Sequence, residues 1–353
     1  MIWHRFTVYG TAALVTLLAG TGCLERKEKI EVRPDGSVTV KLKYKGTADE
    51  LDSMDAMPSA DAGWLLTRTI EENQGNNEQN EVKYVVRSKR KFASGDELPS
   101  SYAEADDPDA DLYLAFPTTV VADRREDGTY YHFRRVYMPR KWAYVSYWEN
   151  RFFNEEIEEL GGKPTEELTR EEQVKIFKAF VLFEAHSQME FAKAALGECD
   201  PELPSDCWLK TRSALMERFN RINYHKLVER YAETPEEERP ARFESEYEAL
   251  IAEAREITFQ SLRDVAGYND AKLAEFELAY DREKHYHEIT DEQGAHQFKI
   301  MVNLPGEIVA HNADRLDQGE DGYLVWEFNG EAFRDRPFEL EAISRLKPGS
   351  EQK

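Results

Sequence analysis

Cysteine and histidine side chains could act as nucleophiles, redox centres or metal ligands, and this chain contains few of them. Cys199 and Cys207 enclose a short segment with two prolines. In an oxidising compartment such a pair favours a disulfide, with two free thiols as the alternative. On a helix the side chains of His285 and His287 point about 200° apart and cannot share a metal ion, although on a strand they could. The sequence therefore predicts a Cys199–Cys207 disulfide, and neither a metal site nor a cofactor.

The chain carries none of the short motifs that mark common catalytic sites. It contains no G-x-S-x-G, H-E-x-x-H, P-loop or G-x-G-x-x-G segment. Asp107, Asp109 and Asp111 have the spacing of the first half of a calcium loop, but Leu112 and Thr118 stand where such a loop requires Gly and Glu. We interpret this stretch as a solvated acidic loop and predict that the protein is not an enzyme.

The third cysteine, Cys23, ends a segment that is typical of secretion signals. Arg5 provides a positive charge, a mostly apolar run covers residues 6–18, and small residues follow. The apolar run is shorter than the roughly 20 residues that a membrane-spanning helix needs. The sequence therefore predicts that residues 1–22 form a cleaved signal peptide.

The end of this segment resembles the lipobox of bacterial lipoproteins. Thr21, Gly22 and Cys23 match that motif, and Gly20 replaces the usual Leu, Val or Ile. The resemblance implies that the Cys23 thiol becomes acylated and that the chain is cut before it; an ordinary secretion signal is the alternative. Two or three acyl chains give stable attachment to a membrane. We expect residues 24–29 to form a very short charged tether.

Composition limits the classes of partner. The chain has 353 residues and a formal net charge of −23, which argues against binding to nucleic acid and against nonspecific binding to anionic lipid. A hydrophobic content of 41% with 12% aromatic residues is enough for a real core.

Alternating polar and apolar residues predict strands at both ends of the chain. Three hairpins are expected in the first half, formed by residues 30–32 with 38–44, 65–70 with 82–92, and 120–125 with 130–137. Further strands are expected near residues 298–302, 304–309, 323–328 and 338–343.

Helical patterns fill the middle of the chain. Thr169 and Glu172 have the spacing of a capping box, and Thr234 followed by Pro235 has the pattern of another helix start. Apolar residues recur at helical spacing through most of residues 141–292. Each apolar stripe is expected to face the core of a helix bundle.

A basic and aromatic stretch stands out in this acidic protein at the boundary between the two patterns. Its prominent members are Tyr130, Arg134, Arg135, Trp142 and Trp148. Trp and Tyr suit wet–dry boundaries, so these residues are candidates for a patch that meets lipid headgroups or an apolar ligand. The alternative is ordinary core packing with solvated arginines, because aromatic residues dominate many cores.

Together these patterns predict an α+β fold, with one antiparallel sheet built from the N-terminal hairpins and the C-terminal strands. The expected parts are a signal peptide (1–22), an N-terminal β-rich part (23–140), a helical insertion (141–292), C-terminal strands (293–346) and a polar tail (347–353). Separate β, α and β domains are the alternative, but the C-terminal strands are too few to bury a core alone.

The two ends of the chain also resemble the LppM-type lipoprotein domain. The resemblance rests on residues 30–44 around the Pro-Asp-Gly-Ser turn, and on residues 303–309 followed by 323–328. It implies an α/β domain near the membrane in the cell envelope, with lipid-like ligands suspected. The long helical section departs from that pattern.

The functional expectation is a non-catalytic lipoprotein, anchored outside the cytoplasm to the cell membrane or the outer membrane. It would bind an apolar or lipid ligand, or an envelope protein partner. A structural or assembly factor that uses the helical section as a docking arm is the alternative, and an envelope hydrolase with a site assembled from distant residues is a weaker one.

Overall fold

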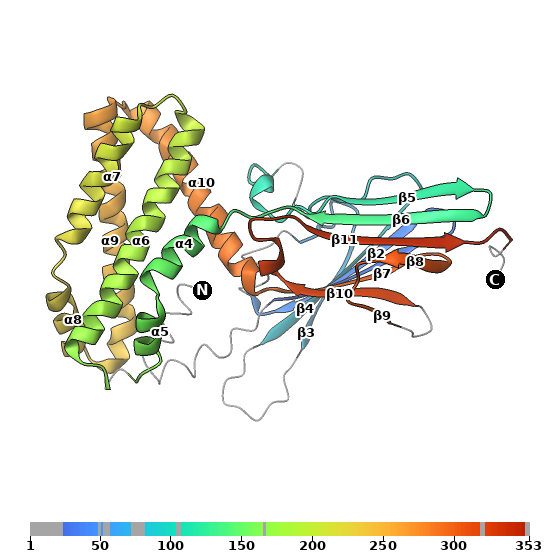
Figure 1. Cartoon of the computed structure of the whole chain (residues 1–353), viewed down its shortest axis with the longest axis horizontal. Helices are drawn as coiled ribbons and strands as arrows, with labels where there is room; N and C mark the ends of the chain where they lie inside the picture. The colour runs from blue at the N-terminus through green and yellow to red at the C-terminus, as the bar shows by residue number, and fades with distance from the viewer. Residues whose placement is uncertain are drawn as a thin grey trace. The chain divides into compact units, whose positions relative to one another are not determined.

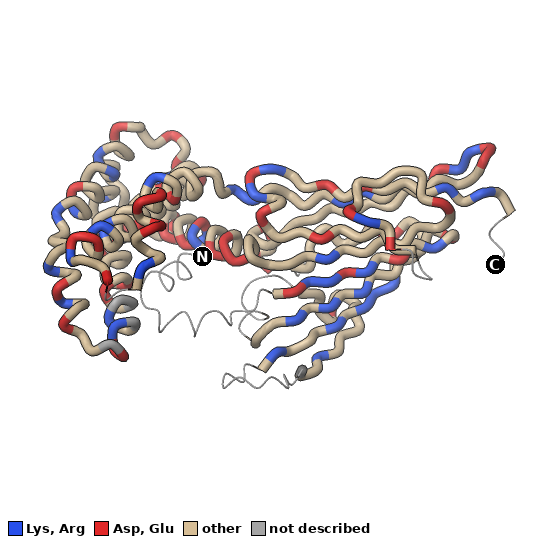
Figure 2. Tube along the Cα trace, turned by 60° about the horizontal axis from the view of Figure 1, so that its bottom comes forward, with Lys and Arg blue, Asp and Glu red and all other residues tan. Residues whose placement is uncertain are grey.

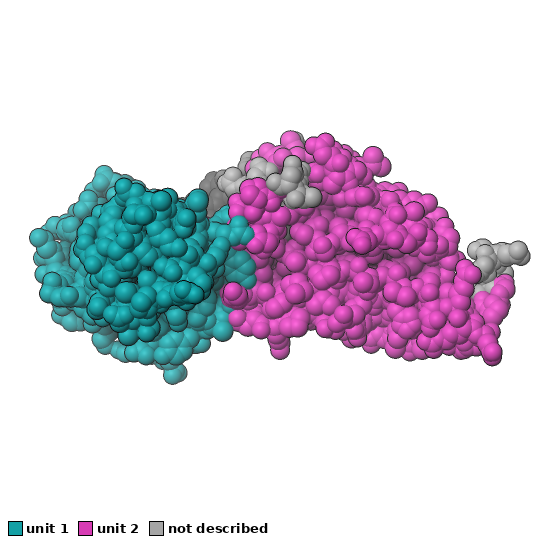
Figure 3. Space-filling view, turned by 90° about the horizontal axis from the view of Figure 1, so that it is seen from above, with its two compact units in different colours: residues 1–19, 142–287 teal, residues 20–141, 288–353 magenta. Residues whose placement is uncertain are grey.

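The computed structural model describes residues 24–48, 51, 57–71, 82–103, 107–164, 167–317 and 322–349. These residues form two compact units (Figure 3), and each unit has its own hydrophobic core. The β unit contains the described residues of 24–141 and 288–349, and the helical unit contains those of 142–287. Cys23 and the predicted signal peptide lie outside the described residues.

Two sheets make up the β unit (Figure 1). The larger has the strand order β3-β4-β2-β1-β7-β10-β9, and the smaller has the order β5-β6-β11-β8. The strands are β1 Glu25–Val32, β2 Val38–Gly46, β3 Leu65–Glu71, β4 Lys83–Phe92, β5 Thr118–Arg125, β6 Gly128–Tyr137, β7 Gln297–Asn303, β8 Glu307–His311, β9 Arg315–Asp317, β10 Tyr323–Asn329 and β11 Phe338–Leu346. Short 3₁₀ helices lie at η1 Ala110–Leu112 and η5 Gly330–Phe333.

Turn chemistry fixes the hairpins at the positions that the sequence indicates. Gly36 has φ +81° in the turn between β1 and β2, where the backbone N–H of Ser37 donates to the Asp35 carboxylate at 2.9 Å. Gly128 has φ +146° at the start of β6, directly after the Asp-containing turn from β5. Only glycine adopts such backbone angles without strain.

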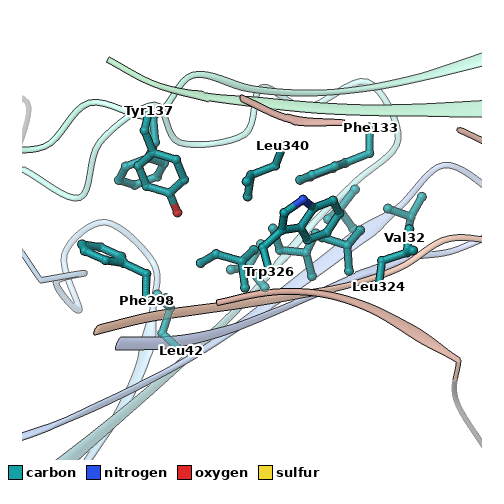
Figure 4. Close-up of a cluster of buried hydrophobic side chains, with 14 of the residues drawn as sticks. Val32, Leu42, Phe133, Tyr137, Phe298, Leu324, Trp326 and Leu340 are labelled. Carbon is teal, nitrogen blue, oxygen red and sulfur yellow. The ribbon is translucent and has the colours of Figure 1, made fainter. Parts of the chain in front are cut away.

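The inner faces of the two sheets enclose the core of the β unit (Figure 4). Trp326 and Leu324 of β10 come from the larger sheet, whereas Phe133 of β6 and Leu340 of β11 come from the smaller one. All four side chains are at most 2% exposed. Burial of this apolar area is the main term that holds the sheets together, since each Å² removed from water contributes roughly 25 cal/mol.

In the helical unit the other helices pack around α6 (Figure 1). The helices are α4 Ala143–Phe152, α5 Glu155–Gly161, α6 Arg170–Cys199, α7 Ser205–Asn220, α8 Tyr224–Glu233, α9 Arg239–Ser261 and α10 Asp270–Ala295, with 3₁₀ helix η3 Glu236–Glu238 and π-helical turn η4 Leu262–Ala266. The last residues of α10, from Glu288 onward, belong to the β unit. The predicted capping box of Thr169 and Glu172 starts α6. By contrast, α9 starts at Arg239, after the short η3, and not at Thr234.

The α+β class and the inserted helical section are confirmed, but the expected single antiparallel sheet is wrong in two respects. The strands form two sheets, and β1 pairs with β7 in parallel. Both ends of the chain contribute to each sheet, as the sequence suggested. The periodicity of a strand shows which residues share a face, but it does not identify the neighbouring strand, so the division into two sheets was not visible in the sequence.

Replacement of Gly128 by Ala should destabilise the β unit. A Cβ atom at this position would lie 2.4 Å from the carbonyl oxygen of Leu346, at the end of β11. We expect the free energy of unfolding to fall by about 2–4 kcal/mol, from overpacking combined with backbone strain. Gly95→Ala is the control, because Gly95 has φ +87° but no atom within 4 Å of a Cβ, and it should cost about 1 kcal/mol. Equal losses in chemical denaturation would refute the close approach of β11 to this turn.

Candidate functional site

The residues expected to form a charged tether are instead part of the central strand of the larger sheet. β1 begins at Glu25 and is hydrogen-bonded on both sides, to β2 and to β7. Its side chains alternate between the two faces, so that Leu24, Arg26 and Glu28 are buried. The prediction of a tether over residues 24–29 is therefore wrong. Charged residues at alternate positions of a strand can form a buried row if they find partners inside the protein.

Arg26 and Glu28 meet a third charged side chain between the sheets. Arg135, on β6 of the smaller sheet, donates from Nη2 to Oε1 of Glu28 at 2.9 Å, and Nη2 of Arg26 lies 3.6 Å from Oε2 of Glu28. Each of the three residues is at most 1% exposed. We call Arg26, Glu28 and Arg135 the interior ionic cluster. It joins the central strand of one sheet to β6 of the other.

Neutral groups add hydrogen bonds to the interior ionic cluster. The hydroxyl of Tyr102 donates to Oε1 of Glu28 at 3.0 Å, and Nε of Arg135 donates to Oγ1 of Thr118 at 2.7 Å. The guanidinium of Arg26 lies 4.8 Å from the ring centre of Phe116 and 4.9 Å from that of Tyr102. These cation–π contacts supply part of the solvation that water no longer provides.

The cluster keeps its charges despite burial. Burial alone would raise the pKa of Glu28, but the charge and hydrogen bond of Arg135 outweigh it and hold that pKa below its usual range. Burial would likewise lower the pKa of Arg135, and Glu28 instead raises it. Burial together with the charge of Glu28 raises the pKa of Tyr102, so its hydroxyl stays protonated and remains a donor. The cluster thus carries one negative and two positive charges.

The start of β1 marks one end of the β unit. The backbone N–H of Gln297, the first residue of β7, donates to the carbonyl of Leu24 at 3.1 Å. The ring of Tyr137, the last residue of β6, lies 6.0 Å from that of Phe298 on β7. The chain passes to the helical unit after β6 and returns just before β7. Both chain crossings therefore lie at the end of the β unit where β1 begins, directly after Cys23.

The five residues predicted as a ligand or membrane patch do not form one exposed surface. Arg135 belongs to the interior ionic cluster, and Trp142 is 4% exposed in the core of the helical unit. Arg134 lies on the opposite face of β6 and pairs with Glu339 and Glu341 of β11. The prediction is corrected accordingly: adjacent strand residues point to opposite faces, so Arg134 and Arg135 cannot share a patch.

The other two patch residues make local contacts. The hydroxyl of Tyr130 donates to the Asp127 carboxylate at 2.7 Å, and the ring of Trp148 stacks on that of His186 at 3.7 Å between centres. Burial, with a smaller contribution from Arg212, lowers the pKa of His186 to about 4. His186 is therefore a neutral aromatic partner of Trp148 in the helical unit at physiological pH.

The cysteines of the helical unit are free thiols in the structure, and the predicted disulfide is not formed there. Cys199 is the last residue of α6, and Cys207 lies in the first turn of α7. The Cys207 thiol is buried and lies 3.7 Å from the backbone carbonyl of Val265, to which it donates. This contact directs the thiol toward η4, which sequence spacing could not indicate.

His285 and His287 lie on α10, where they cannot share a metal ion. The ring of His287 stacks on that of Phe191 at 4.9 Å between centres. Across the described parts of the chain, no three His, Cys, Asp or Glu side chains are placed to hold a metal ion. Among the described helices, none has the length and apolarity needed to cross a bilayer.

Comparison with known proteins gives little further information. No family model matches the chain, and no curated protein matches it. The chain has a remote likeness to the NMR structure of the folded domain of LppM from Mycobacterium tuberculosis, with 7% sequence identity and a TM-score of 0.28. The alignment covers 94% of this chain and 95% of that chain. A likeness at this TM-score carries no argument about fold or function.

Neutralising Glu28 should strongly destabilise the β unit. Glu28→Gln removes the carboxylate charge that Arg135 and Arg26 face, and we expect a loss of about 3–5 kcal/mol at pH 7. Glu31→Gln is a matched control on the outer face of β1, where Glu31 pairs with Lys41 at 2.6 Å in a more exposed setting. It should cost about 1 kcal/mol or less.

The same comparison has a defined pH dependence. The folded pKa of Glu28 is depressed, so its charge stabilises the fold above the unfolded pKa of about 4.3 and ceases to do so as the pH falls through the folded value. The difference in stability between the wild type and Glu28→Gln should be largest near neutral pH and should shrink in acid. A difference that is independent of pH down to the acid transition would contradict the charged cluster.

Proposed function

We propose that this protein is a non-catalytic lipoprotein of the bacterial envelope, acylated at Cys23 and held outside the cytoplasm. The observation that carries the proposal is the position of Leu24. Only one residue separates Cys23 from Glu25, the first residue of the central strand, and Leu24 itself is 2% exposed. A lipid on Cys23 would therefore attach directly to the folded β unit, without a linker.

The position of Cys23 next to β1 favours a role as an anchor over an incidental cysteine. Strand β1 is paired on both sides and is tied to the smaller sheet by the interior ionic cluster, so a force on the anchor is borne by the whole β unit. Two or three acyl chains are enough for stable membrane attachment. Whether the anchor lies in the cell membrane or the outer membrane, the start of β1 at Leu24 lies next to the bilayer.

The sequence and the positions of the charged groups support a binding role for this protein over an enzymatic one. The chain lacks the common catalytic motifs, and the interior ionic cluster is enclosed between two sheets. An active site needs groups that a substrate can reach. We propose that the protein serves an envelope protein or lipid partner, and that nucleic acid is not among its partners because of the net charge of −23.

Substitution of Cys23 tests the proposal. In the native host the wild-type protein should partition with membranes, and its mature N-terminal peptide should carry acyl groups on Cys23 by mass spectrometry. Cys23→Ser should abolish acylation, because serine offers no thiol for the lipid thioether. Cys199→Ser is the control and should leave both acylation and partitioning unchanged. A native N-terminus at Met1 without acylation would contradict the proposal.

A further inference from the structure

The outer face of the larger sheet has a local charge opposite to that of the whole protein. Side chains of β1, β2, β4 and β7 that point away from the core are mainly lysine and arginine, and Figure 2 shows basic segments recurring along the strands of the β unit. We define the basic face as Lys27, Lys29, Lys41, Lys43, Lys45, Arg87, Lys89, Lys91 and Lys299. Acidic residues on the same face include Glu25, Glu31 and Glu327, with Asp317 on the edge strand β9.

The pairing register places the basic residues directly opposite one another on adjacent strands. Lys27 of β1 stands opposite Lys43 of β2 on one side and opposite Lys299 of β7 on the other, and Lys43 in turn stands opposite Arg87 of β4. The next row places Lys29, Lys41 and Lys89 side by side. Like charges directly opposite each other in a sheet are destabilising. Two rows of like charges across adjacent strands are therefore costly, and folding alone does not explain them.

Two of the acidic residues on this face are already engaged in ion pairs. Glu31 pairs with Lys41 at 2.6 Å, and Glu327 pairs with Lys299 and Arg315 at 2.5 and 2.8 Å. Within the described part of the chain, Lys27, Lys43 and Lys89 form no ion pair. Burial and the neighbouring like charges, Lys299 first, lower the pKa of Lys27. The middle of the basic face thus carries uncompensated positive charge.

Two ordinary explanations of surface lysines do not account for this arrangement. Lysines protect exposed edges of sheets from pairing with other chains, but β1 and β2 lie inside the sheet, with partners on both sides. Solubility is served by a mixture of both signs spread over the surface, whereas here one sign is concentrated on one face. The face is instead suited to an extended surface of negative charge.

Chain length places the basic face near the anchor. Cys23 precedes Lys27 by four residues, and a fully extended chain covers at most about 3.6 Å per residue, so their Cα atoms are at most about 14 Å apart. Charges are screened over about 8 Å at physiological ionic strength. An acylated Cys23 therefore brings the nearest lysines to within one or two screening lengths of the lipid headgroups.

We propose that the basic face of the larger sheet docks on the anionic lipid headgroups of the bilayer that holds the anchor. The partner is a membrane surface of phosphate-bearing lipids, recognised by charge. This inference rests on the proposed function for its geometry and extends it by naming the face and the lipid class. The net charge of −23 predicted repulsion from anionic lipid, but an overall sum does not describe the field above one face.

Vesicle binding of the mature chain without its lipid tests the proposal independently of acylation. Residues 23–353 carrying Cys23→Ser would be mixed with vesicles of phosphatidylcholine alone, or of phosphatidylcholine with about one third phosphatidylglycerol. We expect co-sedimentation with the anionic vesicles only, weakening as salt rises. Lys27→Gln, Lys43→Gln and Lys89→Gln combined should lower the partition coefficient about tenfold or more at low salt.

A matched triple variant controls for overall charge. Lys178→Gln, Lys193→Gln and Lys226→Gln remove the same charge from exposed positions on the helical unit, and binding should change by less than about twofold. Thermal unfolding would verify that both triple variants remain folded. Equal losses in the two variants, or binding to neutral vesicles as well, would overturn the proposal.

Two further outcomes separate this inference from the proposed function. Equally tight binding to a soluble polyanion, in competition with anionic vesicles, would assign the face to an acidic macromolecule and overturn the membrane proposal. Acylation of Cys23 with no binding of the unacylated chain to anionic vesicles would leave the lipoprotein proposal standing and refute the docking face. Vesicle binding through the three lysines, without acylation of Cys23 in the host, would support the docking face and refute the lipoprotein proposal.

Discussion

The ion pair between Glu28 and Arg135 is the constraint on which the β unit depends. It joins the central strand of the larger sheet to β6 of the smaller one, inside a core built mainly of aromatic and aliphatic side chains. A buried carboxylate needs opposite charges and hydrogen-bond donors around it, and here these are two arginines and the hydroxyl of Tyr102. The pair therefore ties one defined residue of the larger sheet to one defined residue of the smaller sheet.

The two faces of β1 serve different purposes. Arg26 and Glu28 face inward and hold the sheets together, whereas Lys27 and Lys29 face outward and belong to the basic face. The strand follows directly after the predicted acylation site, so anchor, interior ionic cluster and basic face share one short segment. Attachment without a linker limits the orientations that the β unit can take at a membrane. A charged surface next to the anchor would select among those that remain.

Sequence patterns predicted local structure well and spatial partners poorly. The turn residues around Gly36 and the capping box of Thr169 and Glu172 act within a few residues, and both are present in the structure. By contrast, the pairing of Glu28 with Arg135 joins residues far apart in the chain, and periodicity holds no information on such partners. A tether over residues 24–29 is what their charge predicts, because charged residues are seldom buried. Residues 25–29 are all charged, so polar–apolar alternation begins only at Ile30 and could not place the start of the strand.

The central claim is that β1 presents its outer face to the membrane at its anchor. It is tested most directly with the acylated protein in anionic vesicles, bearing a spin label at Lys29→Cys or Arg134→Cys in a chain with Cys199→Ser and Cys207→Ser. Position 29 is on the outer face of the larger sheet, and position 134 is on the outer face of the smaller one. A headgroup-bound relaxation agent should broaden the signal at position 29 and not at position 134. Equal broadening at the two positions, or none at position 29, would contradict the claim.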